Sequence, residues 1–317
     1  MNGYTRQLIV VNKYWECDPV CWVLTNKYLF DTCNVLLPWP SLTNYPSYGP
    51  VTAQPAAPRM IYTQGNLQAE VWCISDLMSK YSPEYQSSSE YKMKVLGNIF
   101  SYSSNPVNLV AAIGTASSGP FCPEYEGSRQ DNINGSVIVG TKIFMHDAHP
   151  ESDPNPYSKW RCAYFDQLMN SSLTGNDMLT NLTSSGIETA LLCPPNNPAT
   201  NGQRLYVNSE YTAIGDENVT DYNEYKKKDA EAGRAFTTCY PDNDNGVSVE
   251  TTHGLIYAAA REYFKGDPPF LFISGVVDRF TKFDVDVNPS VYAQNVIGAH
   301  NAGVCVALLL SDIMKQS

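Results

Sequence analysis

The sequence has few basic residues relative to its acidic ones. Its 317 residues include 21 Lys and Arg against 32 Asp and Glu, which gives a formal net charge of -11. A protein that binds nucleic acid without regard to sequence needs clustered cations to displace counterions from the phosphate backbone. The one basic run, Lys226 to Lys228, is flanked by acids and predicts a solvated helix face. We therefore expect no nucleic-acid partner.

The sequence also lacks a long apolar run. The first residues, MNGYTRQLIVV, do not have the apolar core and small-residue cleavage site of a signal peptide. The longest later apolar run, Val304 to Leu310, is far shorter than the roughly 20 residues that span a bilayer. We therefore expect no membrane partner and a cytoplasmic location.

Cysteine spacing and the scarcity of histidine argue against disulfides and metal sites. The nine cysteines are odd in number and include no CxxC pair or zinc-like spacing, so reduced thiols are expected. His146 and His149 flank Asp147 without a third ligand nearby, which favours a structural or subunit-contact role. His253 and His300 lie on predicted helices and are expected to be packing residues with satisfied ring nitrogens. We expect neither a metal nor an organic cofactor.

The sequence does contain enough apolar material for a core. Hydrophobic residues make up 43% of the chain and charged residues 17%, which is typical of a globular protein. We expect a single domain over residues 1–317. Insertions are expected near 37–59, where prolines prevent a regular helix, and near 150–200.

Apolar runs alternate with segments of helical spacing. Strands are predicted at Gln7–Val11, Val71–Ile74, Val107–Ile113, Ser136–Met145, Leu205–Asn208 and Pro269–Val277. Helices are predicted at Asp18–Thr25, Ser89–Phe100, Thr220–Gly233, Glu250–Phe264 and Tyr292–Met314. This alternation predicts an α/β sheet covered by helices on both faces, with ligands gathered at the carboxyl ends of the strands.

Two acids lie at the ends of predicted elements. Asp278 ends an apolar strand, where it could face a cleft, cap a loop or pair with Arg279. Glu250 opens a helix, and the positive end of a helix dipole stabilises a carboxylate there whatever its function. Neither acid points to a chemistry when it is considered alone.

Neighbouring motifs give the two acids a context. GVSVETTHGLIYAA followed by PFLFISGVVDRF resembles the ending of the nucleoside phosphorylase and nucleosidase superfamily, in which a Met-Glu pair opens a helix and a later strand ends in a Ser-Asp pair. Upstream, NLVAAIGTASSG and GSVIVGTKIFMHDAH resemble two further blocks of that family in the same order. The resemblance implies a three-layer α/β/α fold with a twisted mixed central sheet.

The resemblance also implies roles for the two acids. Glu250, with Val249 in place of the usual Met, would bind the ribose, and Asp278 would donate a proton to the departing purine. Breaking the N-glycosidic bond leaves positive charge on the sugar and negative charge on the base, which these two groups would offset. Such general acid catalysis contributes on the order of 100 to 10,000-fold.

Other positions of the family's site map onto a turn and an aromatic residue. Gly114 and Thr115 correspond to the Gly-rich turn near the attacking water or phosphate. Tyr211 corresponds to the aromatic side chain that packs on the base. The resemblance further implies a homodimer or higher homo-oligomer whose small-molecule partner is a nucleoside.

One departure from the family concerns the nucleophile. Phosphorylases of the family carry an Arg before the Gly-Thr turn, where this chain has Ala112 and Ile113, and the phosphate would lack a bidentate partner. This favours water, activated by Glu16 or Asp18, of which Glu16 has the better spacing. Lys13 after the first strand keeps phosphorolysis open. The sequence thus predicts a purine-type nucleosidase, with a phosphorylase or a catalytically silent nucleoside-binding or storage relative as alternatives.

Overall fold

The structure is a computed structural model that describes most of the chain in several stretches. The described residues are 4–25, 57–86, 88–118, 132–145, 167–175, 177–179, 182, 186–207, 212–213, 248–250, 252–279, 282–286 and 291–315. The predicted helix at Thr220–Gly233 and much of both expected insertions lie outside them.

Parallel strands form the centre of the sheet. In spatial order they run β3, β1, β4 and β11, and the short strand β2 pairs antiparallel with β3 at the edge. Their bounds are Met60–Gln64 for β2, Leu67–Cys73 for β3, Thr5–Val11 for β1, Val107–Ser118 for β4 and Phe270–Arg279 for β11. The apolar, β-branched sequences of β1, β4 and β11 fit their central positions, because strands buried on both faces carry continuous apolar runs.

The remaining strands turn part of the sheet into a closed ring. β11 pairs with β5, whose chain continues through Thr141 into β6, and β6 pairs with β9. β9 pairs with β10, and β10 returns to the end of β4. These strands span Val137–Gly140 (β5), Lys142–Met145 (β6), Thr212–Ala213 (β9) and Ser248–Val249 (β10), with β7 (Gln167–Asn170) on β6 and β8 (Leu205–Val207) on β5. The predicted strand Ser136–Met145 is therefore two strands, since its halves pair with different neighbours.

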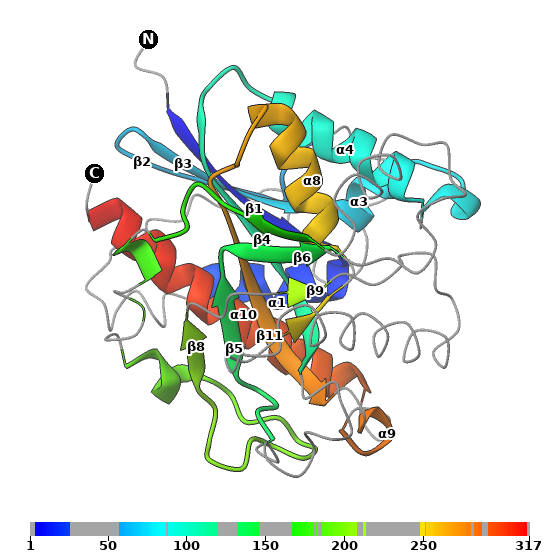
Figure 1. The fold of residues 1–317 in the computed structure, drawn as a ribbon, viewed down its shortest axis with the longest axis vertical. Helices are drawn as coiled ribbons and strands as arrows, with labels where there is room; N and C mark the ends of the chain where they lie inside the picture. The colour runs from blue at the N-terminus through cyan, green and yellow to red at the C-terminus, as the bar shows by residue number, and fades with distance from the viewer. Residues whose placement is uncertain are drawn as a thin grey trace.

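Helices cover both faces of the sheet (Figure 1). One core contains Ile9, Val11 and the buried side of α1 and α10, and the other contains Leu8, Val10 and the buried side of α4 and α8. This division follows from the alternation of side chains along a strand. The helices span Tyr14–Thr25 (α1), Ile74–Met78 (α3), Ser89–Ser101 (α4), His253–Phe264 (α8), Phe283–Asp286 (α9) and Val291–Lys315 (α10), with single 3-10 turns at Pro83–Tyr85 (η1), Asp177–Leu179 (η3) and Ile187–Ala190 (η4). The three-layer α/β/α fold with a mixed central sheet is confirmed.

The long C-terminal helix lies close to the central sheet. A Cβ placed on Gly275 of β11 would lie 1.9 Å from the backbone oxygen of Gly298 in α10. Within the described residues, one stretch, Ala293–Ile313, is long and apolar enough to cross a bilayer, and 72% of its most apolar window is buried inside the protein. The helix packs against α1 and β11, as expected of a core helix.

Several boundaries differ from the predicted ones in ways that affect the site. β4 continues to Ser118 instead of ending at Ile113, because β11 and β10 supply hydrogen-bonding partners for its last residues. β11 continues to Arg279, so Asp278 lies within a strand. α1 begins at Tyr14 rather than Asp18, since the carboxylate of Glu16 accepts a 3.0 Å hydrogen bond from the backbone N–H of Lys13 and stabilises the first turn.

Candidate active site

The candidate site lies where β1, β4, β10 and β11 end. Ser117 of β4 is the register partner of Val249 on one side and of Asp278 on the other. Neighbouring strands lie about 4.8 Å apart, so the backbones of Val249 and Asp278, which lie on either side of Ser117, are separated by roughly 10 Å. Glu250 follows Val249 directly, which places the two acids inferred from the sequence at the same end of the sheet.

Glu16 reaches the same end of the sheet from the first turn of α1. Its Oε1 atom accepts hydrogen bonds from the backbone N–H of Thr115 at 2.8 Å and from the Thr115 hydroxyl at 2.9 Å. Its side chain is almost fully buried. The carboxylate is therefore fixed in position over β4 by partners from two different segments of the chain.

The surroundings of Glu16 change its protonation. Burial, and to a lesser extent the negative charge of Glu250, raise the pKa of Glu16 from 4.5 to about 7, against the opposing effect of its hydrogen bonds from Thr115 and Lys13. A carboxylate with a pKa near neutrality exists in both protonation states at working pH, and it is suited to take up a proton from water.

Glu250 lies at the N-terminus of α8. One of its oxygens, Oε2, accepts hydrogen bonds from the backbone N–H groups of Thr252 at 2.5 Å and His253 at 2.6 Å. These N–H groups have no partner within the helix, and the carboxylate satisfies them. The predicted helix start at Glu250 is therefore wrong by a few residues, because Glu250 precedes the helix at His253 and caps it.

Gly114 is the point where three polar side chains meet. A Cβ built on Gly114 would lie 3.2 Å from His253 Nε2, 3.5 Å from Glu16 Oε1 and 3.5 Å from Glu250 Cγ. These groups come from α8, from α1 and from the segment that precedes α8. A larger residue at 114 would fill the space between them, so the glycine keeps this space available to a small ligand.

Asp278 is held by the adjacent strand. The Ser117 hydroxyl donates to its two carboxylate oxygens at 3.1 and 3.0 Å, and the side chain is buried. A hydroxyl can also accept a hydrogen bond, so Ser117 can pair with either the ionised or the protonated acid. The hydrogen bond from Ser117 is therefore compatible with an Asp278 side chain that loses and regains its proton.

Comparison with solved structures places this arrangement in a known fold. No protein-family model and no curated protein matches the sequence. Solved structures do match over nearly the whole chain: a 5′-methylthioadenosine/S-adenosylhomocysteine nucleosidase from Helicobacter pylori is 13% identical, with a TM-score of 0.51 and coverage of 98% of this chain and 99% of that one. The 5′-methylthioadenosine nucleosidase of Arabidopsis thaliana is 12% identical, with a TM-score of 0.51 and coverage of 99% and 98%. The futalosine hydrolase of Helicobacter pylori is also 12% identical, with a TM-score of 0.50 and coverage of 97% and 98%.

This chain has the nucleosidase fold. The fold that the sequence motifs imply is therefore the fold of these solved structures. At this low identity the likeness establishes the fold, and the roles of individual residues depend on the geometry of this chain.

Asp18, the alternative to Glu16, has a different partner in this nucleosidase fold. The guanidinium of buried Arg59 forms ion pairs with Asp18 of α1 and with Asp76 of α3, the latter with one contact of 2.8 Å. The ion pairs connect the chain before β2 to α1 and α3. Asp18 thus takes part in packing, whereas Glu16 faces Thr115.

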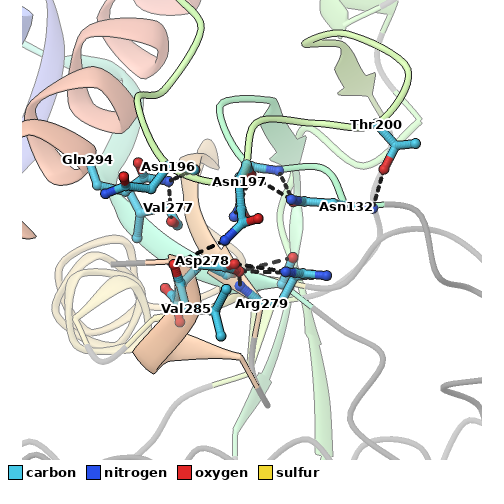
Figure 2. A network of polar contacts seen from close by, with 12 residues as sticks. Asn132, Asn196, Asn197, Thr200, Val277, Asp278, Arg279, Val285 and Gln294 are labelled. Carbon is cyan, nitrogen blue, oxygen red and sulfur yellow. Dashed lines mark hydrogen bonds and ion pairs between the residues drawn. The ribbon is translucent and has the colours of Figure 1, made fainter. Parts of the chain in front are cut away.

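The surroundings of Asp278 are fixed by a network of amides (Figure 2). Gln294 of α10 donates to the carbonyl of Val277 at 2.8 Å, and Asn197 donates to the carbonyl of Val285 at 3.0 Å. Arg279 binds Asp286 through contacts of 2.8 and 3.0 Å, so its carboxylate partner is Asp286. The strand end that carries Asp278 is therefore anchored to α10, α9 and the loop at 194–200.

Some predicted positions lie outside the described residues. Tyr211 is one of them, as are His146, Asp147 and His149. Within the part of the chain that the structure describes, no group of three His, Cys, Asp or Glu side chains is arranged to hold a metal ion.

Two residues of the site were not identified from the sequence. Ser117 lies in the GTASSG segment, but only the pairing of β4 with β11 shows that its hydroxyl binds Asp278. His253 was expected to be a satisfied packing residue, and this expectation is wrong, because neither ring nitrogen has a hydrogen-bond partner among the described residues. Its spacing from Glu250 was the available signal, because an acid just before a helix accepts hydrogen bonds from the N–H groups of the first turn and so lies near the first residues of that helix.

Proposed function

We propose that this chain is a nucleosidase that hydrolyses the N-glycosidic bond of a purine-type nucleoside. The observation that carries the proposal is the placement of Glu16, with its pKa near 7, beside Glu250 at the end of β4, while Asp278 lies across Ser117 from Val249. A base, a sugar ligand and an acid thus lie at one end of the sheet.

The proposed reaction includes two proton transfers, one from the attacking water and one to the departing base. Glu16 takes a proton from water as the water oxygen bonds to the anomeric carbon. The bond from that carbon to the base breaks, and Asp278 gives a proton to the base. Glu250 binds the sugar hydroxyls and offsets the positive charge that develops on the sugar. The products are the free base and the free sugar, and the two carboxyl groups then re-equilibrate their protons with solvent.

The charge of the site supports water over phosphate as the nucleophile. The polar side chains that meet at Gly114 are two acids and His253, and burial lowers the pKa of His253 to about 3. None of these three groups offers a positive charge at neutral pH. Among these three groups a phosphate dianion would therefore meet two acids and no cation, whereas a neutral water would not be repelled.

Product analysis tests the reaction. The protein is incubated with adenosine, inosine, guanosine and 5′-methylthioadenosine, with and without phosphate, in water enriched in ¹⁸O. We expect release of base without phosphate and one ¹⁸O atom in the free sugar. Strict dependence on phosphate with formation of a sugar 1-phosphate would establish a phosphorylase, and binding without release of base would establish a silent relative.

A pair of variants separates the site from general effects on the protein. Glu16→Gln removes the base and should lower kcat at least about 100-fold. Glu90→Gln is the control, because Glu90 is an acid on the outer face of α4 that pairs with Lys94. It should leave turnover unchanged. Equal activity of the two variants would remove Glu16 from the mechanism.

A further inference from the structure

His253 is a buried imidazole whose ring nitrogens have no hydrogen-bond partner among the described residues. Its exposed fraction is 1%, and neither Nδ1 nor Nε2 is satisfied within the described residues. An unsatisfied buried polar atom costs about 1 to 3 kcal/mol. Burial lowers the pKa of His253 to about 3, so the ring is neutral and has one N–H donor and one acceptor at physiological pH. Because burial of the unsatisfied ring costs free energy, we infer that the neutral imidazole binds a ligand.

The position of the ring identifies the space that such a ligand would occupy. Nε2 lies 3.2 Å from the Cβ position above Gly114 and 3.9 Å from Glu250 Oε2. Glu16 Oε1 lies 3.5 Å from that same Cβ position. The three side chains therefore border the space above Gly114, with His253 Nε2 and Glu16 Oε1 as its nearest polar atoms.

Stacking and a backbone hydrogen bond fix the position of the His253 ring. It stacks on Phe272 of β11 with centroids 5.9 Å apart and an interplanar angle of 29°. The backbone N–H of His253 is bound to Glu250, which fixes the first residue of α8. A ring clamped in this way loses little freedom when it binds a ligand, so its contribution to positioning is large.

We propose that His253 Nε2–H donates a hydrogen bond to the water molecule that Glu16 activates. This inference rests on the proposed function. A water molecule has two hydrogens and two lone pairs. In the space above Gly114 it can donate to Glu16 and Glu250 and accept from His253, which leaves one lone pair directed at the anomeric carbon. Buried waters typically have two to four such partners. The bond that forms is from this oxygen to carbon, and the proton released goes to Glu16.

The same geometry explains why a neutral imidazole suits the position better than a cation. A protonated His253 beside Glu16 would favour the ionised, weakly basic form of that carboxylate and lower its pKa. The neutral ring directs the water without reducing the basicity of Glu16. A cation at this position would also attract phosphate, which the proposed reaction does not use.

Substitutions that move the donor test the proposal. His253→Phe keeps a ring on Phe272 but removes both nitrogens. His253→Gln places an amide N–H near the position of Nε2, and His253→Asn places one near that of Nδ1. We expect kcat of the Phe variant to fall about 100-fold, as for loss of one aligned donor, with KM changed by less than about threefold. The Gln variant should recover most of kcat and the Asn variant should not.

His300→Phe is the matched control. His300 packs on Trp22 and contacts Asn301 on α10, and it is not among the three side chains that meet at Gly114, so its substitution should leave kcat unchanged. If the Phe variant of His253 fails to fold, the comparison of Gln with Asn decides the question, because both are small polar residues that differ in the reach of the amide.

Three outcomes would overturn the inference. These are full activity of His253→Phe, equal recovery by Gln and Asn, and a rise in KM at constant kcat, which would assign His253 to the sugar. Wild-type protein that releases no base from any nucleoside would instead refute the proposed function, and the inference about His253 with it. Failure of the inference alone leaves an active wild type, so the two failures are distinguishable.

Discussion

Glu16 and Glu250 show how position determines the chemistry of a residue. Both are glutamates near the start of a helix, and both accept backbone N–H groups there. Glu16 also extends over β4 to Thr115, where burial dominates its pKa. The two residues therefore differ in their surroundings rather than in type, and burial gives Glu16 a raised pKa that suits a base.

The pKa of Glu16 leads to a prediction for the pH profile. If Glu16 is the base, kcat/KM should fall about tenfold per pH unit below pH 7, because only the ionised carboxylate accepts a proton from water. Steady-state rates of base release between pH 5 and 9 measure this. A rate that is constant from pH 5 to 7 would contradict the assignment.

The same shift has a consequence for stability. The folded pKa of Glu16 lies above its unfolded value, so the folded state holds more protons between pH 4.5 and 7 and loses stability as the pH rises through that window. The cost of ionising the buried acid is on the order of 3 kcal/mol. The difference in free energy of unfolding between wild type and Glu16→Gln should therefore change by about that amount from pH 4 to pH 8, in favour of the variant at pH 8. Urea unfolding of both proteins at several pH values measures this difference in free energy. A difference that does not change with pH would contradict the raised pKa of Glu16.

Asp278 and Ser117 form a pair that can be tested together. Asp278→Asn should retain nucleoside binding but lower kcat on bases that need protonation by about 100-fold or more, because the amide supplies no proton of suitable acidity. Ser117→Ala should have a smaller effect on kcat, and adding it to Asp278→Asn should cost little further. Single-turnover kinetics and titration calorimetry measure turnover and binding separately. Unimpaired turnover of Asp278→Asn would remove Asp278 from the mechanism.

At the scale of elements, the approach of α10 to β11 sets the geometry of the site. Gly275 lies against the backbone of Gly298, and a Cβ on Gly298 would lie 2.4 Å from Val277 and 3.4 Å from Thr115. The helix can approach the strand closely because both positions lack a side chain. This close packing fixes Thr115 and Val277, which neighbour Glu16 and Asp278 respectively.

Substitution of Gly275 tests this packing. Gly275→Ala should lower the free energy of unfolding by about 3 kcal/mol or more, because the methyl group would overlap the backbone of α10. Gly97→Ala is the control, since Gly97 is an exposed residue of α4 with no atom near its Cβ position, and alanine there should add up to about 1 kcal/mol of stability. Thermal and urea unfolding measure both. Equal stability of the two variants would contradict the close approach.

The elements themselves were largely predictable from sequence, and their ends were not. The apolar runs gave β1, β4 and β11, and the helical spacing gave α4, α8 and α10. The end of β4 at Ser118 depends on pairing with β11 and β10, which lie far along the chain. Local sequence patterns do not predict which distant strands will pair. The alignment of Val249, Ser117 and Asp278 on three neighbouring strands was therefore found only in the structure.

At the scale of the whole molecule, we propose a homo-oligomer. The family that the sequence resembles forms oligomers with sites near subunit contacts, and Trp22 on α1 is a large apolar side chain that is 51% exposed. Sedimentation velocity at several concentrations should give a mass of at least twice 35.1 kDa. A monomer at micromolar concentration with full activity would contradict the proposal.

The sequence by itself determined the α/β class, the main strands and helices, and the presence of Glu250 and Asp278 at element ends, because these depend on local apolar periodicity and on motif order. The tertiary structure decided which acids face one another, since that depends on strand register and on helices from distant parts of the chain. It placed Glu16 on Thr115 and Asp18 on Arg59, although the two acids are neighbours in one helix. It also brought the His253 ring, whose nitrogens have no hydrogen-bond partner within the part of the chain that the structure describes, to Gly114. Burial and hydrogen bonding are properties of the packed chain, and for that reason the protonation of Glu16 and the availability of His253 could be found only there.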